Sequence, residues 1–186
     1  NLNFVFFTWY RSFSYFCKLK SVLIDSIVFN KKNISYKFDF PVGKPNAKGY
    51  YNAQKFQENY HLGDDWNSVK GGNSDLGDHI YAIANGYVAA TKNHKGGWGN
   101  VIRIIHQLPN KKQVESLYAH CDTIFVKQNS WVKKGQIIGT IGNVDGLYLA
   151  HLHLEIRNKI NLPIGNGYSK DTTGYLDPTE FIKTNR

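Results

Sequence analysis

The sequence predicts a mainly β fold, a compact antiparallel sandwich or barrel-like sheet with long loops. Short β-branched and aromatic runs follow one another closely and are separated by Gly, Asn and Pro. Aromatic residues make up 15% of the chain and there are 17 glycines, a composition that favours strands and turns. Helical periodicity is nearly absent. With 186 residues the chain can bury its own core, so its stability does not require disulfide bonds.

The pattern divides the chain into an N-terminal appendage, residues 1–33, and a domain at residues 34–186. In the appendage we expect a short hairpin or a helix around residues 21–29. The aromatic run at residues 4–10 lacks the flanking charge and the cleavage site of an export signal. The chain contains no methionine, which suggests that it is processed or truncated. No run of 18 apolar residues occurs, so we expect no stable membrane span.

The elements of the second segment follow from its alternation and turn signals. Residues 34–40 alternate apolar and polar residues as a half-buried strand does, and end at Pro41. From Gly43 to about Gly77 we expect a long functional loop, rich in Gly and Asn. The chain end, YLDPTEFI, provides an apolar anchor for the core. Between these two parts the sequence predicts strands at residues 80–91, 100–107, 114–120, 136–141 and 151–157.

The charge balance suggests an anionic partner. A formal charge of +9 and a pI near 9.4 fit nucleic acid, anionic lipid or a bacterial wall rich in carboxylates and phosphates. The basic residues are scattered in pairs such as Lys111-Lys112, and no nucleic-acid-binding motif accompanies them. We therefore expect a solvated basic surface and no nucleic-acid partner. Cys17 and Cys121 are too few for a disulfide framework or a cysteine-built metal site.

The stretch LAHLHLEIR, residues 149–157, places two histidines one residue apart in a predicted strand. Side chains alternate along a strand, so His151 and His153 share one face while Leu152, Leu154 and Ile156 face a core. At about 6–7 Å apart the two imidazoles can belong to one site. Half-exposed histidines on a sheet face are also common, so the triplet alone leaves both interpretations open.

Two further clusters provide partners for these histidines. HLGDD at residues 61–65 lies in the expected loop, and LYAHC places His120 at a strand end. Catalytic zinc takes three protein ligands, usually nitrogen or oxygen, and keeps a fourth position open. His61 and Asp65 with one strand histidine would form such a set. The two remaining histidines could then act as base, acid and oxyanion stabiliser in hydrolysis.

These motifs in this order resemble the M23 metallopeptidases, the lysostaphin and LytM-type peptidoglycan endopeptidases. The resemblance runs from about Phe40 to Ile182 and includes GYVAA, GWGNVIRIIH and VKKGQIIGTIGN. It implies a LytM-type fold with a duplicated hybrid motif. It also implies one Zn²⁺ per chain, held by His61, Asp65 and His153, with His120 and His151 as the unligated catalytic pair.

The resemblance further implies a zinc metalloendopeptidase that hydrolyses peptide cross-links of bacterial peptidoglycan. Such a protein would be periplasmic, bound to the cell envelope or secreted, and we expect it to be a monomer. The alternative is a catalytically silent wall-binding or amidase-regulating module of the same fold. All five family positions are filled in this chain, which favours the enzyme.

Other polar residues have simpler interpretations. We expect Asp64 to be solvated or to support the ligands without binding metal itself, because only Asp65 has the family's spacing. His79 and His94 are expected at the surface or in loops, and His106 as a satisfied core or edge histidine. Cys121 is expected to be a buried packing residue, since adjacent residues of a strand face opposite ways.

Three aromatic residues could line a peptide groove or simply pack in the core. They are Trp66, Trp98 and Tyr118. For Trp98, which lies in a glycine-rich turn, we favour a position at the rim of the groove.

Overall fold

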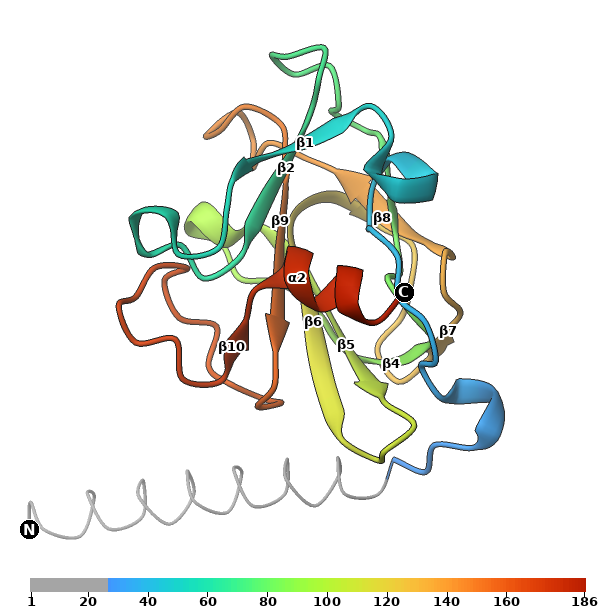
Figure 1. Cartoon of the computed structure of the whole chain (residues 1–186). Helices are drawn as coiled ribbons and strands as arrows, with labels where there is room; N and C mark the ends of the chain where they lie inside the picture. The colour runs from blue at the N-terminus through green and yellow to red at the C-terminus, as the bar shows by residue number, and fades with distance from the viewer. Residues whose placement is uncertain (1–26) are drawn as a thin grey trace, which may run out of the picture. The chain divides into compact units, whose positions relative to one another are not determined.

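The computed structural model describes residues 27–186, of which residues 33–186 form one compact unit (Figure 1). The expected appendage at residues 1–33, with its aromatic run and its hairpin or helix, lies largely outside the described residues. Within the described range, no helix is long and apolar enough to cross a membrane.

Ten strands of the described part of the chain join in one antiparallel sheet, which confirms the predicted mainly β fold. The strand order is β1-β2-β9-β6-β5-β4-β7; β10 pairs with β9, and β8 joins β3 to β6. The strands are β1 (Tyr50–Gln54), β2 (Asp64–Ser68), β3 (His79–Tyr81), β4 (Gly86–Asn93), β5 (Asn100–Gln107), β6 (Gln113–Ile124), β7 (Trp131–Val132), β8 (Ile137–Ile141), β9 (Leu152–Arg157) and β10 (Tyr175–Leu176). The short helical turns are η1 (Lys31–Asn33), η2 (Gly43–Ala47), η3 (Glu58–Tyr60) and η4 (Gly96–Trp98).

The central strand β9 is buried on both of its faces. Leu152, Leu154 and Ile156 point into the main core, as the alternation predicted. The opposite face carries His153 and two buried charged residues, Glu155 and Arg157. A second, small apolar cluster of Val101, Leu117 and Ala119 has Trp98 and Ile164 packed against it. Ile164 belongs to the segment after β9, so this segment covers part of the sheet's second face.

The predicted strand at residues 34–40 is wrong. Ile34 forms an isolated bridge with Gln107, and the following residues make no ladder. The backbone amides of Phe38 and Asp39 instead donate to the carbonyls of Asn185 and Ile83, which lie in a helix end and a turn. The alternation reflects side-chain burial along an irregular segment.

The expected long loop from Gly43 to Gly77 is also wrong as a description of the backbone. It contains β1 and β2, which pair with each other, and β2 pairs in turn with β9. β2 reads DDWNS and has no β-branched residue. It forms a strand because Asp64, Trp66 and Ser68 are buried and because both neighbouring strands hydrogen-bond to it.

The remaining predicted strands are present with shifted limits. The segment predicted at residues 80–91 is divided into β3 and β4 by a break at residues 82–85, at the predicted Asn85-Gly86 turn. β6 continues past His120 to Ile124, with an irregular register between Cys121 and Ile124 where it pairs with β8. This strand was predicted to end at His120, but it continues through this residue.

The chain ends in helix α2 (Pro178–Thr184), which lies beside β9 and β10 in Figure 1. Asp177 caps it by accepting a hydrogen bond from the backbone amide of Glu180, and Pro178 occupies its first turn. Ile182 is fully buried, and the ring of Phe181 packs 5.0 Å from that of Phe38. The expected apolar anchor is confirmed.

Candidate metal centre

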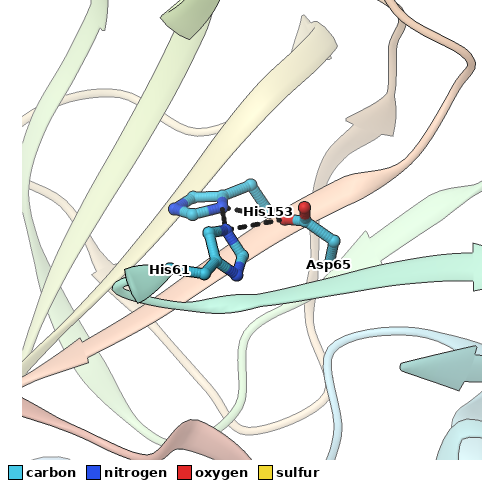
Figure 2. Close-up of side chains that lie close together, drawn as sticks. All are labelled: His61, Asp65 and His153. Carbon is cyan, nitrogen blue, oxygen red and sulfur yellow. Dashed lines mark hydrogen bonds and ion pairs between the residues drawn. The ribbon is translucent and has the colours of Figure 1, made fainter. Parts of the chain in front are cut away.

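Three predicted side chains converge where β2 meets β9. Asp65 and His153 are direct partners in the register of these antiparallel strands, and His61 immediately precedes β2. Figure 2 shows the three side chains pointing toward one another. Nδ1 of His153 lies 2.9 Å from Oδ1 of Asp65 and 3.0 Å from Nε2 of His61. Nε2 of His61 lies 3.4 Å from the same carboxylate oxygen.

These separations suit a tetrahedral metal. Ligand atoms about 2.0–2.2 Å from a tetrahedral ion lie roughly 3.3–3.6 Å from one another, and a small outward movement of the side chains would reach that spacing. Two imidazoles and one carboxylate are the donor types that zinc takes in catalytic sites. The residues present therefore fit a zinc ion.

Gly63 allows the two strands to approach at this point. A Cβ atom there would collide with the carbonyl of Leu154 and would lie 2.9 Å from Cε1 of His153. The glycine of HLGDD is thus required by the close packing of the His61–Asp65 segment against β9.

His153 is held by carboxylates on both ring nitrogens. Its Nδ1 faces Asp65, and its Nε2 lies 3.2 Å from Oε1 of Glu155. Burial lowers the pKa of His153, but Asp65 and Glu155 outweigh burial and raise the pKa to about 9 in the metal-free protein. Burial would raise the pKa of Asp65, yet hydrogen bonds to His153 and His61 hold that pKa well below its usual range. A metal must therefore displace a proton from His153.

We expect zinc affinity to rise with pH for this reason. One displaced proton gives up to about a tenfold gain in affinity per pH unit below the raised pKa of His153. Calorimetric titration at pH 7 in two buffers of different ionisation enthalpy should report about one proton released per zinc. Equal affinity at pH 6 and pH 8 would contradict this reading of His153.

His120 and His151 lie beside the three-ligand cluster. Their ring centroids are 4.6 Å apart, and that of His120 is 5.7 Å from that of His153. Nδ1 of His151 hydrogen-bonds the carbonyl of Leu149, which turns its Nε2 toward Oδ1 of Asp65, 4.0 Å away. This nitrogen is placed to exchange a proton with a molecule bound next to the cluster.

His120 is in an environment that keeps its ring neutral. Burial, followed by the nearby His153 and His151, lowers the pKa of His120 to about 3. Its backbone has a φ of 59°, in the left-handed region that costs a non-glycine residue about 1 kcal/mol or more. Such strained conformations concentrate at functional sites, where the surrounding structure maintains them.

All five predicted residues line one cleft of about 540 Å³. Trp98 lies on its wall, as expected. Sequence reasoning missed the other wall residues, which are Gln54, Gly97, Tyr148, Gly165, Asn166, Gly167 and Tyr168. The Gly-Asn-Gly-Tyr stretch at residues 165–168 was a detectable signal, because such stretches form loops in which the backbone itself can line a site.

Asp64 was expected to be a solvated carboxylate or one that supports the ligands, and its surroundings differ from both. It is 1% exposed, and it accepts hydrogen bonds from the backbone amide of Phe56 and the hydroxyl of Thr179. As the neighbour of Asp65 on β2 it points to the other face of the strand, toward α2. It lies outside the three residues that could hold a metal ion.

The other candidates behave as expected. His79 is exposed and His94 is partly buried. His106 is fully buried and hydrogen-bonds the carbonyl of Asn85 and the hydroxyl of Ser116, so it is a satisfied core histidine. Cys121 packs in the main core. Trp66 and Tyr118 also belong to this core, and therefore pack without lining the cleft.

Comparisons with known proteins agree with this site. A sequence profile of "Peptidase family M23" matches residues 61–167, a range that contains all five site residues. "Lipoprotein NlpD" of Yersinia enterocolitica is 42% identical over 83 residues, which cover 45% of this chain and 80% of that protein. "Murein hydrolase activator NlpD" of Escherichia coli (strain K12) is 38% identical over 96 residues, covering 48% of this chain. The match spans only 24% of that second relative.

A solved structure shares the fold. It is that of a zinc-containing peptidase from Vibrio cholerae, with 27% sequence identity and a TM-score of 0.54. The match covers 69% of this chain and 41% of that one.

Proposed function

Because this chain belongs to peptidase family M23, we propose that it is a zinc-dependent endopeptidase that hydrolyses peptide cross-links of bacterial peptidoglycan. One observation carries the proposal: a His-Asp-His cluster of metal-ligand geometry shares a cleft with two further histidines that are not part of it. A purely structural metal site closes its fourth position with another protein ligand, whereas a catalytic site leaves it open.

In this proposal His61, Asp65 and His153 hold the ion. Bound zinc would polarise the scissile carbonyl and lower the pKa of water, which supplies a nucleophile near neutral pH. Nε2 of His151 orients the attacking water and accepts its proton. The uncharged ring of His120 donates a hydrogen bond to the developing oxyanion. The proton collected during attack then passes to the leaving amine.

The cleft walls suit a peptide of the wall polymer. Trp98, Tyr148 and Tyr168 present aromatic surface, and the Gly165–Gly167 backbone lets an extended chain approach closely. The net charge of +9 would attract an anionic polymer, an effect that weakens with added salt. We propose that the protein acts as a monomer in the bacterial envelope, outside the cytoplasm; relatives named as a lipoprotein and as a murein hydrolase activator support this location.

Zinc should also stabilise the fold, because its ligands join β2 to β9. At free zinc about 100 times the dissociation constant, binding adds about 2.7 kcal/mol to the free energy of unfolding. For a domain of this size we expect the melting temperature to rise by roughly 5–10 °C. Melting curves with zinc and with excess chelator test this. Identical curves would show that the metal does not bind the folded state selectively.

A second function is favoured by the relatives named murein hydrolase activator. In this case the domain would increase hydrolysis by a separate wall amidase without cutting the wall itself. The His120→Ala variant separates the two functions: an enzyme loses its own activity, whereas an activator still stimulates the amidase.

Release of soluble fragments from dye-labelled peptidoglycan tests the proposed enzyme. We expect zinc-loaded protein to release dye, and chelator-treated protein to release none. Release that persists in excess chelator would overturn the metal-dependent mechanism. Absence of release from several wall types, together with stimulation of an added amidase, would establish the activator in its place.

A further inference from the structure

We propose that Glu155 and Arg157 couple the metal ligand His153 to the wall of the cleft, with Arg157 as the positioning residue for both. This inference rests on the metal site proposed above. It concerns residues that the metal chemistry itself does not use.

The first step of the coupling lies on one face of β9, where positions 153, 155 and 157 follow one another. Nε2 of His153 lies 3.2 Å from Oε1 of Glu155. Oε2 of Glu155 accepts a hydrogen bond from Nε of Arg157 at 2.6 Å, and Nη2 of Arg157 forms an ion pair with the same oxygen at 2.6 Å. Glu155 and Arg157 are fully buried. A carboxylate on the outer nitrogen of a ligating histidine fixes which ring nitrogen faces the metal.

The second step joins Arg157 to the segment after β9. Its Nη1 donates to the carbonyls of Leu162 and Pro163, at 3.2 and 3.3 Å, and its Nη2 donates to that of Ile164, at 3.2 Å. These three carbonyls directly precede Gly165, the first residue of this segment in the cleft wall. The guanidinium therefore holds the wall segment through its backbone.

Only an arginine can serve both steps. Its planar guanidinium bonds and pairs with Glu155 through Nε and Nη2 and still reaches the backbone carbonyls through Nη1 and Nη2, whereas a lysine ammonium is a single point of contact. These hydrogen bonds are partly buried, so the loss of their donor leaves carbonyls that water replaces only in part and weakens the conformation of the segment. Displacement of Arg157 should thus disturb the wall segment and His153 together.

Arg103 provides a matched control. It donates to Glu115 at 2.6 and 2.9 Å and to the carbonyl of Leu162 at 2.9 Å. It is bonded to the same wall segment as Arg157, and its Glu115 partner also lies 3.9 Å from Nη1 of Arg157, but its hydrogen bonds go to Glu115 and Leu162 and leave the Arg157–Glu155 pair in place. Arg103→Lys should therefore loosen the segment without changing the support of His153.

The experiment compares Arg157→Lys, Arg103→Lys and wild-type protein. Zinc affinity is measured by competition with a chelating dye. Hydrogen exchange is followed at the amides of Asn161 and Ser169, which donate to Oε2 of Glu115 and to the carbonyl of Tyr60. We expect Arg157→Lys to bind zinc about 10–100-fold more weakly and to exchange faster at both amides. Arg103→Lys should exchange faster at Asn161 and keep the wild-type zinc affinity.

Wild-type protein gives an independent test should Arg157→Lys fail to fold. Coupling predicts that added zinc slows exchange at Asn161 in the unaltered chain, because this amide donates to Glu115, which lies 3.9 Å from Nη1 of Arg157. If zinc binds the wild type but leaves this exchange rate unchanged, the coupling is wrong. Equal zinc affinity of a folded Arg157→Lys and the wild type would also reject it while leaving the proposed function intact. Failure of the wild type to bind zinc would instead reject the metal site, and the coupling with it.

Discussion

His153→Ala is expected to lose both zinc and hydrolytic activity. His153 supplies the central ligand atom of the cluster, since its Nδ1 lies within 3.0 Å of both His61 and Asp65. Its removal leaves one imidazole and one carboxylate, too few for a catalytic zinc site. Metal catalysis contributes several kcal/mol, so the rate should fall on the order of 10³-fold or more. Zinc content by atomic emission and fragment release from peptidoglycan measure the two losses.

His79→Ala is the control for this substitution. His79 is exposed on β3 and does not line the cleft. It should keep one zinc per chain and full activity. A His153→Ala protein that retained stoichiometric zinc would show that the cluster does not hold the metal. The melting curve of each variant is compared with that of zinc-free wild type, which separates loss of metal from loss of fold.

His120→Ala is expected to keep zinc and to lose turnover. His120 is outside the three-ligand cluster, yet its ring lies against those of His151 and His153 in the cleft. Positioned acid, base and hydrogen-bonding groups contribute about 10²–10⁴-fold to rate. We expect a fall of this size in kcat with little change in KM. If His120→Ala lost zinc as readily as His153→Ala, the assignment of ligands and unligated histidines would be wrong.

The placement of His151 and His153 on one face could be predicted because strand geometry is simple. A period of two residues places His151 and His153 on one face whatever the rest of the fold does. The structure agrees, with both histidines in the cleft and Leu152 in the core. What the residues alone could not provide was the register of β2 against β9, which makes Asp65 and His153 direct partners. The order of the motifs supplied that link through the resemblance to a family.

The two wrong predictions, for residues 34–40 and for β2, have one physical origin. In both segments, burial and hydrogen bonding depend on distant parts of the chain and cannot be read from the local sequence. Residues 34–40 alternate like a strand, but the amides of Phe38 and Asp39 bond to Asn185, just after α2, and to Ile83 in a turn. The sequence of β2 looks like that of a loop because it is polar. Its buried Asp64 is satisfied by hydrogen bonds from Phe56 and Thr179, which the local sequence of β2 does not reveal. Tertiary contacts outweigh intrinsic propensity in both segments.

The buried charges of β9 illustrate the same limit. Glu155 and Arg157 would ordinarily indicate a solvent-exposed strand face. Both are fully buried; Arg157 bonds Glu155 and the carbonyls of residues 162–164, so the two charges are paired inside the protein. Only the structure shows that hydrogen bonds run from His153 through Glu155 and Arg157 to the backbone carbonyl of Leu162, next to the cleft wall.

Mass spectrometry of fragments released from purified peptidoglycan tests the central claim most directly. The zinc-loaded protein is compared with chelator-treated protein and with His120→Ala. We expect fragments with newly formed peptide amino and carboxyl ends, released only by zinc-loaded protein with His120 intact. Such ends would establish peptide-bond hydrolysis and identify the bond that is cut. Absence of new peptide ends from a protein that binds one zinc per chain would contradict the claim.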